Sequence, residues 1–413
     1  MAEGRFCDEL EIRDPGTRER DLFAALPAQL AYAKAHAPYY ARTLAGVEPR
    51  AVKSRGQLAE LPVTRKSDLI GLQKNDPPFA GLNTAGKGEL ARLFMSPGPI
   101  YEPEGRRADF WRLKRALYAA GFRPGQLVHN CFSYHLTPAG AMLESAAFAL
   151  GCAVVPGGTG QTELQLRAIS ELKPDGYTGT PSFLKTLNEK ARETGTDISC
   201  LKRALVSGEA FPPGLQKDIA AAGIDAYQCY ATAELGLISY ESEARQGLIL
   251  DEQIIVEILR PGTGDPVNPG EVGEIAVTLF SKEYPLIRFA TGDLSAILPG
   301  QSPCGRTNQR IKGWLGRADQ TAKVKGLFVH PAQIAETVKR HPGLGRTRLI
   351  IGHDGKNDVM TLEAEAAGAD PALAARIAES LTAITKLRGE IRLVPPGSLP
   401  NDGKVIEDRR KPP

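Results

Sequence analysis

Short apolar runs and longer amphipathic stretches alternate along the chain from about residue 125 onward. The runs have the length of β-strands, and the stretches repeat apolar residues three and four positions apart, the spacing of one helix face. A repeated order of strand and helix predicts a mainly parallel sheet with crossover helices. The predicted strands are residues 126–132, 152–158, 176–181 and 203–210, and the predicted helices are residues 162–172, 182–193 and 212–223.

The pattern changes on both sides of this central part. Residues 20–45 repeat apolar positions at helical spacing around Pro27 and predict one helix or two. Residues 254–280 alternate apolar and polar positions around a turn rich in Pro and Gly, which predicts an antiparallel β unit. We therefore expect an α/β protein with a large multi-layer N-terminal domain, residues 1–316, of mainly parallel sheets plus this β unit. A small α+β C-terminal domain, residues 317–413, is expected to follow.

The composition is that of a soluble globular protein, and 413 residues are enough for two or more domains. Lys and Arg total 51 and Asp and Glu total 48, a net charge of +3 that is too balanced to indicate a nucleic-acid partner. The charged N-terminus predicts no signal peptide, and the longest apolar stretch, residues 141–155, is broken by Glu144 and too short to span a membrane. We therefore expect a cytoplasmic protein without a membrane partner.

The six cysteines are scattered and show no C-x-x-C spacing. Such spacing is typical of zinc sites, and a regular cysteine pattern is typical of disulfide frameworks. The sequence therefore predicts neither zinc nor a disulfide framework. The cysteines are Cys7, Cys131, Cys152, Cys200, Cys229 and Cys304.

Residues 286–334 carry the features of a nucleotide site. Asp293 ends an apolar run beside turn glycines, and Arg317 follows in a second glycine turn. An aspartate can accept two hydrogen bonds from a ribose diol, and the fixed fork of an arginine can hold a phosphate or ribose oxygen. Taken alone, Asp293 also fits a turn cap and Arg317 a surface salt bridge, so both alternatives stay open on the residues themselves.

The motifs of this stretch resemble a known family. F-A-T-G-D, residues 289–293, followed by G-R-A-D-x-x-x-K-V-K-G, residues 316–326, resembles the paired signatures of adenylate-forming acyl-CoA synthetases, and of phenylacetate-CoA ligases in particular. The order of motifs recurs from about residue 90 to the C-terminus. The resemblance implies AMP or ATP as nucleotide, Mg²⁺, a small carboxylic acid, a CoA or carrier-protein thiol, and a mobile C-terminal domain hinged near Asp319. It is also compatible with a homodimer.

The resemblance assigns residues to the nucleotide. It implies that the loop after residue 206 packs on adenine, that Tyr230 stacks on adenine, and that Glu234 takes a catalytic role by holding Mg²⁺. An ordinary turn and a core tyrosine remain the alternatives. Ala231 and Ala233 depart from the family pattern, where glycine and a hydroxyl residue are usual. The implied nucleotide residues are Ser207, Gly208, Glu209, Ala210, Gln228, Tyr230, Ala231, Asp293 and Arg317.

The acid and its activation are implied by two further segments. Leu399 to Lys404 resembles the L-P-x-x-x-G-K loop, whose lysine stabilises charge that develops during adenylation, so Lys404 is the second catalytic candidate. A solvated basic tail is the alternative for Lys404, and a packed histidine is the alternative for His135. The implied acyl pocket contains Tyr134, His135, Gly157 and Gly158.

The phosphate loop departs most from the resembling family. Residues 96–103 read S-P-G-P-I-Y-E-P where relatives carry a loop of Ser, Thr and Gly. Two prolines remove backbone donors that would hold phosphates, and Glu102 would repel them. The sequence therefore predicts AMP or an acyl-adenylate more securely than ATP. We expect an acyl-adenylate-handling ligase for a small carboxylic acid, with aromatic acids among the candidates. The alternative is a homologue, atypical or catalytically silent, that binds AMP or a preformed acyl-adenylate and does not use ATP in the standard way.

Overall fold

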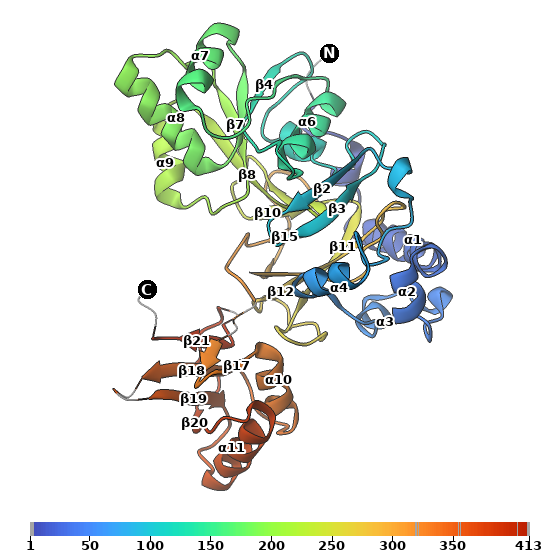
Figure 1. The fold of residues 1–413 in the computed structure, drawn as a ribbon, viewed down its shortest axis with the longest axis vertical. Coiled ribbons are helices and arrows are strands. Elements are labelled where there is room, and N and C mark those ends of the chain that lie inside the picture. Colours follow the sequence, from blue (N-terminus) through green and yellow to red (C-terminus); the bar gives the residue numbers. More distant parts are fainter. Residues whose placement is uncertain are drawn as a thin grey trace.

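The computed structural model describes residues 4–318, 320, 322–353, 355, 357–402 and 404–410. Figure 1 shows a large body formed by the N-terminal and central parts of the chain, with the C-terminal elements in orange and red gathered beside it. The predicted hinge residue Asp319 and the glycine of the predicted lysine loop, Gly403, lie outside the described residues. Within the described residues, no helix has the length and apolar character needed to cross a membrane.

A nine-stranded mixed sheet forms the centre of the large body, with the strand order β14-β15-β10-β9-β8-β7-β6-β4-β5. Strands β5 to β8 pair in parallel, and the strands from β9 to β14 continue the sheet with antiparallel pairs. The expected alternation of strand and helix is confirmed in the parallel half. The strands are β4 (Leu127–Asn130), β5 (Ala153–Val155), β6 (Gly176–Gly179), β7 (Arg203–Val206), β8 (Asp225–Thr232), β9 (Gly236–Glu241), β10 (Leu248–Leu250), β14 (Ile297–Leu298) and β15 (Arg310–Ile311).

Helices cover both faces of the parallel half because its strands are apolar on both sides. On β7, Ala204 and Val206 pack in one core with the helices α7, α8 and α9, whereas Leu205 packs in another core with α5 and α6. Figure 1 shows α7, α8 and α9, in green, stacked on the same side of the sheet. These helices are α5 (Lys114–Ala119), α6 (Ala139–Leu150), α7 (Thr162–Leu172), α8 (Pro181–Thr194) and α9 (Pro213–Ala221).

A second, four-stranded sheet has the order β1-β13-β12-β11. The predicted antiparallel unit is its pair β11 (Ile254–Leu259) and β12 (Gly273–Leu279), and β13 (Phe289–Ser295) continues it. The short β1 (Thr64–Arg65) from the N-terminal part adds in parallel to β13, so residues far apart in sequence lie at one edge.

N-terminal helices pack on this sheet. Helix α1 (Pro15–His36) continues through Pro27, so the prediction of one helix or two is met by a long helix that Pro27 does not divide, followed by the short α2 (Pro38–Thr43). Buried side chains of both helices share one apolar core with β11, β12 and β13. The other short elements of this part are η1 (Glu9–Ile12), η2 (Pro49–Ala51), α3 (Arg55–Ala59), η3 (Lys66–Asp68), α4 (Leu69–Asn75), η4 (Lys87–Glu89), β2 (Arg92–Ser96) and β3 (Ile100–Glu104).

The C-terminal elements have a core of their own, made by buried residues from 322 to 406. A four-stranded sheet of order β20-β19-β18-β21 and a hairpin, β16 with β17, carry the helices α10 and α11. A separate core is what a separate domain requires, while the boundary at residues 316 and 317 and the mobility remain predictions. The elements are β16 (Ala322–Val324), β17 (Leu327–Val329), α10 (Pro331–Lys339), β18 (Thr347–His353), β19 (Asp358–Glu365), α11 (Pro371–Thr385), β20 (Glu390–Val394) and β21 (Ile406–Asp408).

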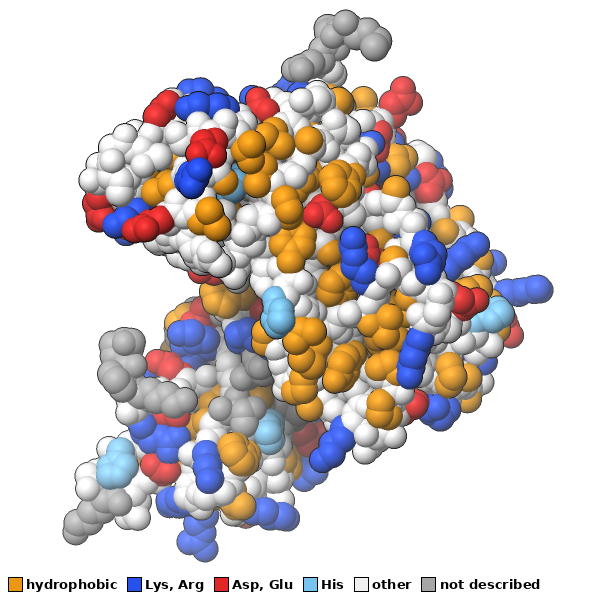
Figure 2. Space-filling model, turned by 45° about the horizontal axis from the view of Figure 1, so that its top comes forward, with side chains coloured by type: hydrophobic (Ala, Val, Ile, Leu, Met, Phe, Trp, Pro, Cys, Tyr) orange, Lys and Arg blue, Asp and Glu red, His pale blue; other side chains and the backbone are white. Residues whose placement is uncertain are grey.

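The surface carries charges of both signs. Figure 2 shows Lys and Arg side chains beside Asp and Glu side chains over the visible face, and hydrophobic side chains gathered on the large body. This mixture is consistent with the small net charge of +3.

Candidate active site

The Asp293 carboxylate is the centre of a polar cluster at the second sheet. Its Oδ2 accepts a hydrogen bond of 2.7 Å from the Tyr230 hydroxyl, and its Oδ1 accepts one of 3.0 Å from the Trp314 indole N–H. The Arg317 guanidinium lies 3.1 Å from the same Oδ1. The structure therefore brings together Tyr230, Asp293 and Arg317, three of the predicted nucleotide residues, and adds Trp314.

Backbone pairing places this cluster. The segment before the predicted hinge runs along β13, where Leu294 N–H donates to the Gly316 carbonyl and Ala318 N–H donates to the Gly292 carbonyl. Gly292 has φ +77°, and a Cβ there would lie 2.7 Å from Nη2 of Arg317. Glycine is therefore required at position 292 for the guanidinium to lie against the strand.

Tyr230 is the donor in this cluster because it keeps its proton. Burial, and then the charge of Asp293, raise the pKa of Tyr230 well above its usual value. Its hydroxyl also lies 3.2 Å from the Thr291 hydroxyl, which comes from the same strand as Asp293. A neutral tyrosine held from two sides orients the carboxylate, and its ring packs, partly buried, against the apolar core of the second sheet.

The loop 207–210 follows β7 at the carboxyl edge of the parallel strands, where ligands of such sheets bind. The Ser207 hydroxyl donates to the Cys229 carbonyl at 2.8 Å, and the Glu209 carboxylate accepts from Ser182 N–H at 2.6 Å, at the start of α8. Gly208 has φ +85° and is exposed, and Ala210 is exposed as well. The loop is thus anchored at Ser207 and Glu209 and leaves backbone atoms open to a ligand.

Gln228 and Ala231 lie on the same strand, β8, as Tyr230. Gln228 faces Glu241 on β9: its N–H lies 3.2 Å from one carboxylate oxygen and its amide nitrogen lies 3.4 Å from the other. The strand pairing shifts by one register between Tyr230 and Ala231. Ala231 therefore stands at an irregular point of the ladder, next to the ring that is predicted to stack on adenine.

The predicted phosphate loop is a tight hairpin between β2 and β3. Ser96 donates both its hydroxyl and its N–H to the Glu102 carboxylate, and the two prolines of the turn, Pro97 and Pro99, have no N–H to donate. Glu102 is fully buried, and burial followed by the charge of Glu234 raises the pKa of Glu102 to about 8. At neutral pH this carboxyl group is mostly protonated.

Glu234 lies in the turn between β8 and β9 and is buried. The Lys66 ammonium lies 2.7 Å from its Oε1, and apart from this contact neither carboxylate oxygen accepts a hydrogen bond from the described residues. Carboxylate oxygen is the ligand that Mg²⁺ prefers, so Glu234 fits the predicted metal role, although Lys66 holds it here. Across the described residues, no group of three or more His, Cys, Asp or Glu is placed to hold a metal ion.

The predicted acyl residues meet around Asn130, at the end of β4. The Asn130 side-chain amide donates to the Tyr134 hydroxyl at 2.7 Å and to the Gly140 carbonyl at 2.9 Å, and the Asn130 backbone carbonyl accepts from Gly158 N–H at 3.0 Å. A Cβ at Gly140 would lie 2.8 Å from the Tyr134 ring. Asn130 therefore fixes both Tyr134 and Gly158, although no motif in the sequence marks it.

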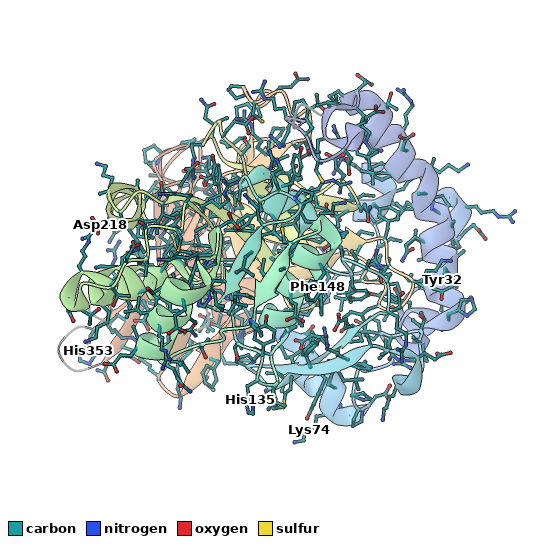
Figure 3. All side chains as sticks on the ribbon, turned by 90° about the horizontal axis from the view of Figure 1, so that it is seen from above. Tyr32, Lys74, His135, Phe148, Asp218 and His353 are labelled. Carbon is teal, nitrogen blue, oxygen red and sulfur yellow. The ribbon has the colours of Figure 1, made fainter. Side chains whose placement is uncertain are left out.

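The Gln165 side chain of α7 holds the glycine loop, residues 157 and 158, in place by hydrogen bonds. Its amide donates to the Gly157 and Gly158 carbonyls at 2.9 and 3.0 Å, and its oxygen lies 2.6 Å from Nε2 of buried His129. His135, in contrast, is exposed, and Figure 3 shows it at the periphery of the molecule. The structure thus joins Gly157 and Gly158 to Tyr134 and leaves His135 outside this network.

Lys404 lies at a different place from the Asp293 cluster. It lines a cavity of about 930 Å³ between the turn at residues 260–272 and the C-terminal elements, and this cavity is not lined by Asp293, Tyr230 or Glu234. Nearby, the Asn401 side chain accepts from Val272 N–H at 3.1 Å. Lys404 and the nucleotide cluster are therefore apart in this arrangement of the chain.

Residues outside the predicted set complete the site. Trp314, Asn130 and Lys66 contact predicted residues directly, Glu102 contacts Ser96 of the predicted phosphate loop, and the four come from separate segments. The sequence marked Pro99 and Glu102 as departures from the phosphate-loop motif of residues 96–103. Lys66, which follows β1, lies in no motif. Its place is created by the pairing of β1 with β13.

Comparisons with known proteins agree with one another. A family model described as AMP-binding enzyme matches residues 119–278. The chain is 32% identical to a phenylacetate-coenzyme A ligase of Thermus thermophilus over 81% of this chain and 78% of that protein. It is 30% identical to the ligase of the same name from Escherichia coli over 81% and 79%. An open conformation of 2-hydroxyisobutyryl-CoA ligase in complex with 2-HIB-AMP and CoA has a TM-score of 0.74 at 26% identity, covering 97% of this chain and 93% of that chain.

Proposed function

The chain belongs to the phenylacetate-coenzyme A ligase family of AMP-binding, adenylate-forming enzymes, and we propose that it joins a small carboxylic acid to coenzyme A at the cost of ATP. In the first half-reaction, a carboxylate oxygen attacks the α-phosphorus of ATP, and acyl-AMP and pyrophosphate form. In the second, the thiol attacks the acyl carbon, the thioester forms, and AMP leaves. We expect this reaction to take place in the cytoplasm.

The Asp293 cluster is the observation that carries the proposal. Its carboxylate is already oriented by Tyr230, Trp314 and Arg317, with distances of 2.7, 3.0 and 3.1 Å, and its side chain is 12% exposed, the part that a ribose diol would reach. Preorganised acceptors and donors lower the cost of binding because their side chains are already ordered. The loop 207–210 supplies the open backbone against which an adenine would pack.

The acid would bind between Tyr134 and the glycine loop. A Cβ at Gly158 would meet nothing within 4 Å, so this glycine leaves open space for a planar ring, whereas Gly140 and Gly157 pack directly on Tyr134 and Gln165. The Asn130 amide keeps the Tyr134 ring in place. We propose a small aryl acid as substrate on these grounds, with short branched acids as the second class, since the similar structure with a TM-score of 0.74 is a 2-hydroxyisobutyryl-CoA ligase.

Glu234 would hold Mg²⁺, which when bound neutralises phosphate charge as pyrophosphate leaves. Lys404 would stabilise the same developing charge after a rotation of the C-terminal elements brings it from the cavity to the carboxylate and the α-phosphate. CoA is the acceptor we propose, and a carrier-protein thiol is its alternative. A silent AMP-binding homologue is the competing function, and the comparisons do not favour it because the relatives are ligases.

The test is thioester formation from ATP, CoA and a panel of aryl and short-chain acids, with ATP–pyrophosphate exchange measured in parallel. Lys404→Ala is expected to lower exchange by about 100-fold, as loss of one charge-stabilising donor does, and to spare thioester formation from a supplied acyl-adenylate. Lys386→Ala is the matched control, because Lys386 is an exposed lysine in the same part of the chain. Absence of exchange and of thioester with every acid, together with AMP binding, would establish the silent homologue instead.

A further inference from the structure

We give the name hairpin cluster to four buried polar side chains, Ser96, Glu102, Glu234 and Tyr284, and the partly exposed Lys66, after the β2–β3 hairpin that carries Ser96 and Glu102. We propose that the Lys66 ammonium is a built-in cation that competes with a divalent metal ion for the Glu234 carboxylate, and that Glu102 is the second carboxyl group of the metal site that opens when Lys66 leaves. The inference deepens the proposed function and rests on it in taking Glu234 as the metal carboxylate.

The position of Lys66 is set by the fold. Lys66 follows β1 directly, and β1 pairs with β13, the strand that carries Asp293. Its side chain is 27% exposed, whereas the Glu234 side chain has no exposure, so the ammonium reaches inward to a carboxylate that solvent does not touch. A monovalent cation is thereby fixed 2.7 Å from Oε1 of Glu234.

The pair differs from a buried ion pair that only stabilises the fold. Arg288 and Glu257 form such a pair: two hydrogen bonds of 2.9 Å join the guanidinium to the carboxylate, and further backbone carbonyls accept its remaining N–H groups. Buried charges need such extra hydrogen bonds to offset their desolvation. Glu234 has none from the described residues.

The Tyr284 hydroxyl is a second buried polar group, and the charges of Glu234 and Glu102 act on it. The Tyr284 hydroxyl is buried without a hydrogen-bond partner among the described residues, and its pKa is raised by burial and then by the charges of Glu234 and Glu102. Glu102 points inward as well, with Ser96 as its donor. The Lys66 ammonium contacts Glu234, and Ser96 contacts Glu102. These carboxyl and hydroxyl groups, together with the Tyr284 hydroxyl, are oxygen donors of the kind that Mg²⁺ and Mn²⁺ bind.

The competition has a direct consequence for metal binding. In the wild-type chain, a divalent ion must displace Lys66 before it reaches Glu234, so metal binding in the absence of nucleotide is weak. Removal of the ammonium leaves Glu234 and Glu102 without a cation, and the space becomes an oxygen site with a net negative charge. A divalent ion then binds without displacing anything.

The test uses Mn²⁺ as the probe and the full chain without nucleotide, with free Mn²⁺ measured by electron paramagnetic resonance. Lys66→Met is expected to bind one Mn²⁺ at least tenfold more tightly than the wild type, and Lys66→Arg is expected to resemble the wild type because it keeps the charge. The double variant Lys66→Met with Glu234→Gln is expected to lose the added site. Lys74→Met is the matched control, because Lys74 is exposed and lies at the periphery in Figure 3.

Two results would overturn the proposal. One is equal Mn²⁺ affinity of the wild type and Lys66→Met, and the other is tight wild-type binding that Glu234→Gln abolishes. Lys66→Gln, which keeps a hydrogen-bond donor, replaces Lys66→Met if circular dichroism shows that the latter does not fold. The half-saturating Mg²⁺ concentration for ATP–pyrophosphate exchange is expected to be lower in Lys66→Met than in the wild type. Because Mn²⁺ binding is measured without acid or CoA, its failure is distinguishable from a failure to form thioester.

Discussion

Replacement of Glu102 by Gln is expected to change how the stability of the protein depends on pH. Glu102 is fully buried, and its pKa is raised from 4.5 to about 8 by burial and then by Glu234. Over the window between these values the folded chain holds a proton that the unfolded chain has lost, so the free energy of unfolding falls as pH rises. The slope is about 1.4 kcal/mol for each pH unit, or about 2 to 3 kcal/mol between pH 6 and pH 8.

Urea denaturation followed by circular dichroism measures this effect in both proteins at several pH values. Glu102→Gln cannot lose a proton, so its advantage over the wild type is expected to grow steadily from pH 6 to pH 8 and to level off above. Every other titrating group is common to the two proteins and cancels in the difference. Glu60→Gln is the control, because Glu60 is exposed. A difference that stays constant with pH would refute the buried, protonated state of Glu102.

Three further predictions concern single side chains. Tyr230→Phe removes the donor 2.7 Å from Asp293 and is expected to weaken AMP binding by about 0.5 to 1.5 kcal/mol, measured by calorimetry; unchanged affinity would contradict the orienting role. Arg288→Met leaves Glu257 buried without its partner and is expected to lower the free energy of unfolding, measured by urea denaturation, by about 3 to 5 kcal/mol. A decrease below about 1 kcal/mol would contradict the stabilising role of this ion pair. Gly208→Ala places a side chain at φ +85° and is expected to cost about 1 to 2 kcal/mol, and an unchanged melting temperature would exclude the strain.

Local sequence patterns were sufficient for much of the fold. Residues 162–172 were predicted as a helix and are α7, and the predicted helix at 212–223 contains α9 (Pro213–Ala221). The apolar stripe of such helices is set by residues a few positions apart, so it can be read without knowledge of the fold. The pairing of β1 with β13 joins residues 64 and 289, and no local pattern carries information about a contact across such a separation.

The same lack of information about distant contacts explains which residues of the candidate site could be predicted from the sequence. Asp293 and Arg317 were predicted because the motif that contains them is short, and the structure places them in contact. Trp314 lies three positions before Arg317, yet its role depends on the backbone pairing that turns its indole N–H to Asp293. Lys66 could not be predicted, because it reaches Glu234 only through the pairing of β1.

Glu102 shows how burial changes the chemistry that a sequence suggests. From the sequence, its carboxylate was expected to repel a polyphosphate. In the structure it is enclosed under the hairpin, with Ser96 as donor, and its pKa of about 8 keeps it largely neutral at pH 7. A neutral carboxyl group does not repel phosphate by charge. The obstacle to ATP that remains is therefore the loss of N–H donors at Pro97 and Pro99.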